Sequence, residues 1–309
     1  LSLHDALPIY SQILSQQFNI KEEYAKNIIT LLDDGNTIPF IARYRKEMHG
    51  SMDDQLIREF AEKLEYLRGL DKRRDEIRSL IDAQEKLTDE INLALDKAAT
   101  LSELEDIYRP YRPKKKTRAS IAKEKGLEPL ANDILKQEKG FDPSKSAVDY
   151  IDEENGVTSV EDAIQGAMDI IAELVSDNAE IRKRIRNLTN ANGVLVSVAT
   201  DEEKDSVYKN YYDYKEPVKK IAGHRVLAVN RGEKEGFLKV SVETDSEKPL
   251  NSIFRAMITD KNQLCSDIIR EACTDAYQRL IYPSIEREVR NDLTDTASEN
   301  AMKVFAVNL

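Results

Sequence analysis

The sequence predicts a mainly α-helical protein that carries one small β element. Apolar residues recur every three or four positions over most of the 309 residues, which is the period of a helix with one buried face. Charged residues make up 33% of the chain and aromatic residues 6%, with no tryptophan, and this balance favours charged helix faces over a β-sandwich. The clearest strand pattern is the apolar run 194–198, which follows the turn-forming pair Asn192-Gly193.

The first half of the chain is predicted to be a series of helices with identifiable ends. Gly35 is expected to end the second helix in a left-handed conformation, which glycine adopts without steric cost. Residues 37–40 are expected to be extended, because the residue before Pro39 avoids the α region. A long helix is expected from Ser51 onward, and Thr88 is expected to cap the helix after it.

Residues 10–192 are therefore expected to form one helical region, and residues 159–190 have a helix-turn-helix-like pattern. Ser159 precedes an acid by three positions, as in a capping box, and Asp177-Asn178 breaks the pattern into two helices. The specificity of this pattern is low, because any two helices joined by a tight polar turn produce it.

Residues 193–245 are predicted to form a small mixed α/β segment. Residues 230–236 are interpreted as a turn, in which Gly232 and Gly236 take positive φ. The predicted strands cover residues 194–198, 225–229 and 237–242.

Residues 246–309 are expected to return to helix, in three pieces. Cys265 and Cys273 fall eight positions apart in this helical pattern, which suits neither a disulfide nor a metal site, and a reduced, cytoplasmic setting is the simplest interpretation. The three pieces cover residues 250–258, 264–282 and the residues from Ile285 onward.

Several function classes find no support in the sequence. No apolar run approaches the roughly 20 residues of a membrane span. The three histidines are scattered, and no phosphate loop, nucleophile elbow or zinc-binding motif occurs. We therefore expect a chain that is not an enzyme, needs no metal or other cofactor, and has no membrane partner.

One short stretch concentrates positive charge although the chain has a formal net charge of −11. Pro110 and Pro113 are expected to hold this stretch extended, so that its basic side chains can follow a phosphate backbone while two tyrosines stack on unpaired bases. The candidate nucleic-acid-binding residues are Tyr108, Arg109, Tyr111, Arg112, Lys114, Lys115, Lys116 and Arg118. In the alternative, the tyrosines pack against neighbouring helices and the basic residues pair with the acid-rich helix before them.

Three blocks of the chain resemble the N-terminal half of the Tex family, the bacterial RNA-binding transcription accessory proteins. The blocks are LLDDGNTIPFIARYRKE at 31–47, LEDIYRPYRPKKKTRASIAKEKGLEPLA at 104–131 and HRVLAVNRGEKEGFLKV at 224–240. The resemblance covers the chain from about Tyr10 to Leu309.

The resemblance implies an elongated, mostly helical N-terminal region with a helix-turn-helix-like part. It also implies that residues 246–309 lead toward an RNase-H-like domain, helix-hairpin-helix units and an OB-fold RNA-binding domain that are missing here. No catalytic residue carries over, because none of the matching blocks is a catalytic motif. Within the first block, Arg43, Arg45 and Lys46 are expected to contact phosphate or to anchor a neighbouring helix, and we favour the structural role.

Two hypotheses about function follow. In the first, the chain is part of a Tex-type protein that binds RNA or single-stranded nucleic acid and assists the transcription machinery. In the second, it is a helical scaffold for protein interaction with no nucleic-acid contact of its own. The first nine residues, LSLHDALPI, read as one frame of common sequencing-adapter DNA, so we treat residues 1–9 as a non-native segment and expect the chain to be a fragment.

Overall fold

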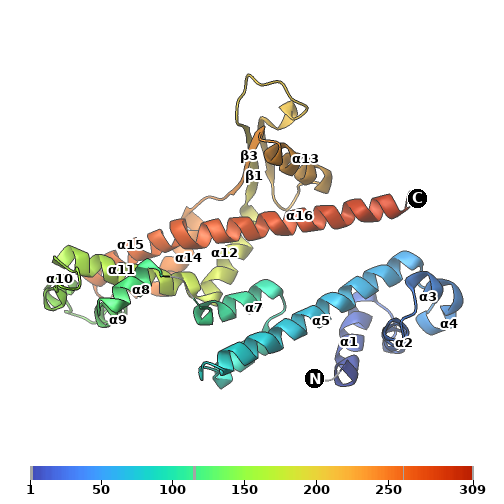
Figure 1. The fold of residues 1–309 in the computed structure, drawn as a ribbon, viewed down its shortest axis with the longest axis horizontal. Helices are drawn as coiled ribbons and strands as arrows, with labels where there is room; N and C mark the ends of the chain where they lie inside the picture. The colour runs from blue at the N-terminus through green and yellow to red at the C-terminus, as the bar shows by residue number, and fades with distance from the viewer. Residues whose placement is uncertain (1–2, 114–115, 260, 308–309) are drawn as a thin grey trace. The chain divides into compact units, whose positions relative to one another are not determined.

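The computed structural model describes residues 3–113, 116–259 and 261–307 and is mainly helical, as predicted (Figure 1). The chain divides into two compact units, with the boundary between Tyr108 and Arg109. Within the described residues no helix is apolar over enough of its length to cross a membrane.

The first unit is built entirely of helices in its described part. Its core gathers apolar residues from α1, α2, α3 and α5, and Phe18 and Phe60 meet there with ring centroids 5.3 Å apart. The helices are α1 (Leu3–Phe18), α2 (Glu22–Asp33), α3 (Ile38–Tyr44), α4 (Lys46–His49), α5 (Asp54–Asp82), α6 (Asp89–Lys97) and α7 (Leu101–Tyr108). Because α1 begins at Leu3, residues 3–9 are helical, although the sequence marks them as part of a non-native segment.

The predicted helix ends of this unit are correct in part. Gly35 has φ +79° directly after α2, and Thr88 accepts a hydrogen bond from Ile91 N at 3.3 Å as the N-cap of α6. The long helix α5 begins at Asp54, three residues after the predicted start, and Asp53 is its N-cap.

The prediction that residues 37–40 are extended is wrong beyond Thr37. Thr37 is extended, but α3 begins at Ile38 and holds Pro39 in its first turn. A proline there forfeits no helical hydrogen bond, because the first N–H groups of a helix have no partner within it. The burial of Ile41, which is 0% exposed, supplies the packing that outweighs the local bias of the residue before proline.

The second unit joins a helical body to a small sheet. One apolar core runs through α8, α9, α11, α12, α14, α15 and α16. The helices of this unit are α8 (Arg118–Glu124), α9 (Glu128–Lys136), α10 (Pro143–Ala147), α11 (Val160–Asp177), α12 (Ala179–Asn192), α13 (Gly223–Lys234), α14 (Glu247–Met257), α15 (Gln263–Asp275) and α16 (Tyr282–Val307), with short 3₁₀ turns at Arg109–Tyr111, Val148–Tyr150 and Lys209–Tyr211.

The sheet has three antiparallel strands in the order β2-β1-β3. They are β1 (Val194–Ala199), β2 (Asp213–Pro217) and β3 (Leu238–Glu243), and Val196 of β1 lies opposite Lys215 and Ser241. Figure 1 shows the sheet and α13 beside α16, and both α13 and β3 contact that helix. The predicted strands 194–198 and 237–242 are therefore confirmed, whereas the polar strand β2 was missed.

The predicted strand 225–229 and the turn around Gly232 are wrong, because both fall inside α13. Gly232 lies in the helix where Leu238 packs against it, and an added Cβ would meet Leu238 Cδ1 at 2.5 Å. A glycine at this position allows Leu238 to pack closely against the helix, and no turn is formed there. Gly236 does take positive φ, at +78°, where the chain leaves α13 for β3.

The last two predicted helices are continuous in the structure. A π-helical turn over Ala276–Ile281 connects α15 to α16, so the chain stays helical past Pro283. A proline in an α-helix clashes with the carbonyl four residues earlier, which here belongs to Arg279 inside the π turn. The altered turn therefore accommodates Pro283 without ending the helix.

The core of the second unit also contains an ion cluster between α12 and α16. Arg182 is 1% exposed, and its Nη2 donates to Glu288 Oε1 at 2.8 Å and to Ser284 Oγ at 2.9 Å. Arg186 donates to the other carboxylate oxygen of Glu288 from Nε at 3.0 Å and from Nη2 at 2.8 Å. A single carboxylate thus serves two guanidinium groups where little water reaches them.

We expect Glu288→Gln to lower the free energy of unfolding by about 3 kcal/mol, because two buried guanidinium groups lose the charged carboxylate that accepts their hydrogen bonds. Urea denaturation followed by circular dichroism measures this change. Asp205→Asn is the matched control, since Asp205 pairs with Lys209 at 2.8 Å on an exposed surface and its loss should change little. Equal effects of the two substitutions would contradict a special role for the buried cluster.

Candidate nucleic-acid interface

The basic stretch 108–118 lies at the boundary between the two units. Its first residue, Tyr108, ends α7, and Arg109–Tyr111 form a 3₁₀ turn. The prediction of an extended start is therefore wrong for these residues, because the fixed φ of Pro110 is compatible with a tight turn as well as with an extended chain. Lys114 and Lys115 lie outside the described residues.

The two tyrosines of this stretch differ in accessibility. Tyr108 is 7% exposed, and the guanidinium of Arg73 lies over its ring at 5.8 Å from the centroid. The sequence left open whether Tyr108 stacks on bases or packs against neighbouring helices, and in this structure it is packed. Tyr111 is half-buried, and this burial raises the pKa of its phenol.

The basic residues of this stretch differ in how far they are exposed. Arg109 Nε donates to Asp177 Oδ1 at 3.1 Å, which holds the 3₁₀ turn against the end of α11. Lys116 Nζ lies 3.6 Å from Glu124 Oε2, but both side chains are about two-thirds exposed, so water and salt weaken this pair. Arg112 and Arg118 are exposed.

Arg118 occupies the first position of α8. Thr117 and Ser120 form a reciprocal capping box, with Ser120 N donating to Thr117 Oγ1 at 3.0 Å and Thr117 N donating to Ser120 Oγ at 2.8 Å. This cap fixes the backbone conformation at Arg118, the first residue of α8. Arg118 therefore projects from a well-defined helix start on the surface of the second unit.

Asp169 of α11 is the acidic group that Arg118 influences. Burial raises the pKa of Asp169, while the positive charges of Arg118 and Arg279 oppose that rise. The net shift is upward, so desolvation of the carboxylate outweighs its attraction to the two arginines.

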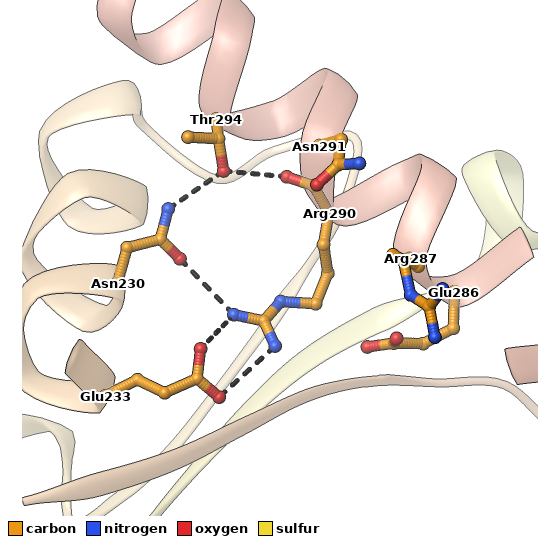
Figure 2. Close-up of a pocket in the computed structure, with 7 residues that line it drawn as sticks. All are labelled: Asn230, Glu233, Glu286, Arg287, Arg290, Asn291 and Thr294. Atoms are coloured by element: carbon orange, nitrogen blue, oxygen red, sulfur yellow. Dashed lines mark hydrogen bonds and ion pairs between the residues drawn. The ribbon is translucent and has the colours of Figure 1, made fainter. Parts of the chain in front are cut away.

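A second polar site lies between α13 and α16, and sequence reasoning missed it (Figure 2). Arg290 pairs with Glu233 through both of its terminal nitrogens and donates from Nη1 to Val240 O at 2.9 Å. Asn230 Nδ2 donates to Thr294 Oγ1 at 2.8 Å on the other side of the pocket. Because its central arginine is already held by a carboxylate and a carbonyl, we interpret this site as a structural joint between sheet and helix.

The cysteines offer no catalytic nucleophile. Both are free and buried in α15. Burial raises the pKa of the Cys273 thiol to about 12, which keeps it protonated at neutral pH. In the described part of the chain, no group of three or more His, Cys, Asp or Glu side chains is arranged to hold a metal ion.

Comparison with known proteins matches both parts of this fold. The family model described as the Tex-like protein N-terminal domain matches residues 9–82, and the model described as Tex central region-like matches residues 138–305. The fold is thus that of a mainly helical Tex-like N-terminal and central region. The chain belongs to the Tex family.

Three relatives illustrate the breadth of this family. The protein YdcI of Bacillus subtilis (strain 168) is 42% identical over 97% of this chain, and the transcriptional accessory protein Tex of Neisseria gonorrhoeae is 35% identical over 97%. The human S1 RNA-binding domain-containing protein 1 is 30% identical over 96%. The chain spans 42%, 40% and 31% of the lengths of these three relatives.

We expect Asp169→Asn to raise stability at neutral pH, because the raised pKa means that the folded state holds the ionised carboxylate at a cost. The difference from the unchanged protein should disappear as the pH falls below 3.8, where the carboxyl is protonated in both states. Thermal unfolding between pH 3 and pH 8 measures it.

Asp162→Asn is the control on the same helix. Hydrogen bonds from Thr158 lower the pKa of Asp162, so this substitution should reduce stability at neutral pH and converge with the unchanged protein in acid. A loss of stability at neutral pH in Asp169→Asn would mean that the attraction of Arg118 and Arg279 outweighs burial.

Proposed function

We propose that this chain is the N-terminal and central part of a transcription accessory protein of the Tex type, which binds single-stranded nucleic acid and has no enzymatic activity. Family membership supports the role, since one relative is named a transcriptional accessory protein and another an S1 RNA-binding domain-containing protein. A role in transcription would place the chain in the cytoplasm with RNA and the transcription machinery as partners.

The observation that carries a nucleic-acid contact for this part is the exposed end of the basic stretch. Arg112, Lys116 and Arg118 are exposed within seven positions, and the ion pair of Lys116 with Glu124 is a long surface pair. Phosphate groups compete well for such cations, because releasing counterions from the nucleic acid favours binding at low salt. Local charge acts at contact range, where screening limits the influence of the distant acidic residues.

The scaffold hypothesis also has an observation in its favour. The pair between Arg109 and Asp177 and the burial of Tyr108 are what a purely structural role of this stretch requires. In that case further domains expected for the family would provide the nucleic-acid contacts, and this part would hold them in position. The two hypotheses differ in whether these residues bind a nucleic acid by themselves.

We expect the chain to bind fluorescently labelled single-stranded RNA in a salt-dependent manner. With four or five phosphate contacts in the basic stretch, that stretch by itself should contribute about −3 to the slope of log K against log salt, at about 0.7 per contact. Replacing Lys114, Lys115, Lys116 and Arg118 with alanine should remove most of this contribution. Fluorescence anisotropy over a range of salt concentrations measures both quantities.

The charge-matched control replaces four exposed lysines elsewhere in the same unit, namely Lys139, Lys145, Lys215 and Lys248. It should leave the affinity nearly unchanged if binding is local. An equal loss in both variants would show that only net charge matters, and unchanged binding in the first variant would contradict the role of the basic stretch. Cleavage of the RNA above a blank would contradict the proposed absence of enzymatic activity.

A further inference from the structure

An exposed set of aromatic and basic side chains covers α3 and the start of α4 in the first unit. We name it the α3 surface. Tyr44 is 65% exposed and Phe40 is 37% exposed, and their ring centroids lie 5.3 Å apart. The guanidinium of Arg45 lies over the Phe40 ring at 5.7 Å from its centroid. The α3 surface consists of Phe40, Arg43, Tyr44, Arg45 and Lys46, all of them exposed.

The helices that carry the α3 surface are held in place by a core residue and by a buried hydrogen bond. Ile41 of α3 is 0% exposed and belongs to the core of the first unit. His49 is also buried, and its Nε2–H donates to Ile41 O at 3.0 Å, which fastens the end of α4 to α3. The aromatic residues are therefore exposed on a helix that already packs against the core of the first unit through Ile41.

The cations of the α3 surface are not held in ion pairs within the described part of the chain. Within the described part of the chain, no carboxylate forms an ion pair with Arg43, Arg45 or Lys46. Other basic residues of the same unit are paired, as Arg68 is with Asp33 at 2.7 Å and Arg58 with Asp54 at 3.1 Å. Three neighbouring exposed cations in an acidic protein thus form a local positive patch.

We infer that the α3 surface is a binding site for single-stranded nucleic acid. The α3 surface combines an exposed ring with three exposed cations, and a single strand offers both phosphate groups and planar bases that are free to stack. A duplex would offer its phosphates but keep its bases paired, which leaves the exposed Tyr44 ring unused. An acidic peptide would satisfy the cations but supplies no regular row of flat rings.

This site is separate from the basic stretch of the second unit, and the inference does not depend on the function proposed for that stretch. The α3 surface carries its own cations and its own stacking group, and it belongs to a different compact unit. The sequence left two roles open for Arg43, Arg45 and Lys46, and the lack of a carboxylate partner in the described residues favours the phosphate contact over the helix anchor.

Tyr44→Trp provides a direct test, because the chain contains no tryptophan. A base that stacks on the new indole should quench its fluorescence in a saturable manner when single-stranded RNA or DNA oligonucleotides are added. Tyr66→Trp is the matched control, since Tyr66 is also exposed in the first unit and also has a cation, Lys63, 4.8 Å from its ring centroid. Its fluorescence should not change.

Anisotropy with the same oligonucleotides tests the charges and the ring separately. Arg43→Ala/Arg45→Ala/Lys46→Ala should make the slope of log K against log salt shallower by about 2, at roughly 0.7 per phosphate contact. Lys72→Ala/Lys86→Ala/Lys97→Ala removes equal charge from exposed positions of the same unit and should leave the slope unchanged. Tyr44→Ala should weaken binding about fivefold or more, whereas Tyr44→Phe, which keeps the ring, should not.

The results separate this inference from the proposed function. Quenching of Tyr44→Trp that persists when Lys114, Lys115, Lys116 and Arg118 are alanine supports the α3 surface whatever the basic stretch does. The inference is overturned if the oligonucleotides bind but leave the indole of the Tyr44→Trp variant unquenched, or if they do not bind at all. It is also overturned if duplex RNA or polyglutamate competes as well as the single strand, because charge alone would then explain binding.

Discussion

The second unit depends on the contact between two arginines of α12 and one carboxylate of α16. Arg182 is almost completely buried, and a charged group is tolerated there only with an opposite charge and hydrogen bonds. Glu288 supplies both, and in doing so it sets the position of α12 along α16. The sheet and α13 attach to the same helix through Arg290 and Glu233, so α16 serves as the common support of the unit.

The charged residues of this chain therefore fall into two kinds with different physical effects. Arg182 and Arg186 are held by a carboxylate where little water reaches them, and the half-buried Arg290 is held by Glu233; these arginines position helices. Cations on the surface contribute little to stability, because water already solvates them. A group of neighbouring surface cations that form no ion pair in the described residues is a candidate site for an anionic ligand, and the α3 surface is such a group.

The two candidate contact surfaces complement each other chemically. The end of the basic stretch offers charge, while Tyr108 within it is buried and Tyr111 half-buried. The α3 surface offers charge together with an exposed aromatic ring. The basic stretch would thus offer phosphate contacts, and the α3 surface phosphate contacts together with stacking, and neither kind of contact depends much on base sequence.

The sequence by itself determined the helical class, most helix positions, the strands β1 and β3, and the family, because these follow from local periodicity, from turn residues and from long specific blocks. Only the tertiary structure decided that residues 225–229 are helical, since Gly232 is there to accept Leu238 and not to form a turn. It likewise decided that Tyr108 is buried and Tyr44 exposed, although both are tyrosines beside arginines in the sequence. The physical reason is that burial and ion pairing depend on residues far apart in the chain, and local sequence patterns do not identify those residues.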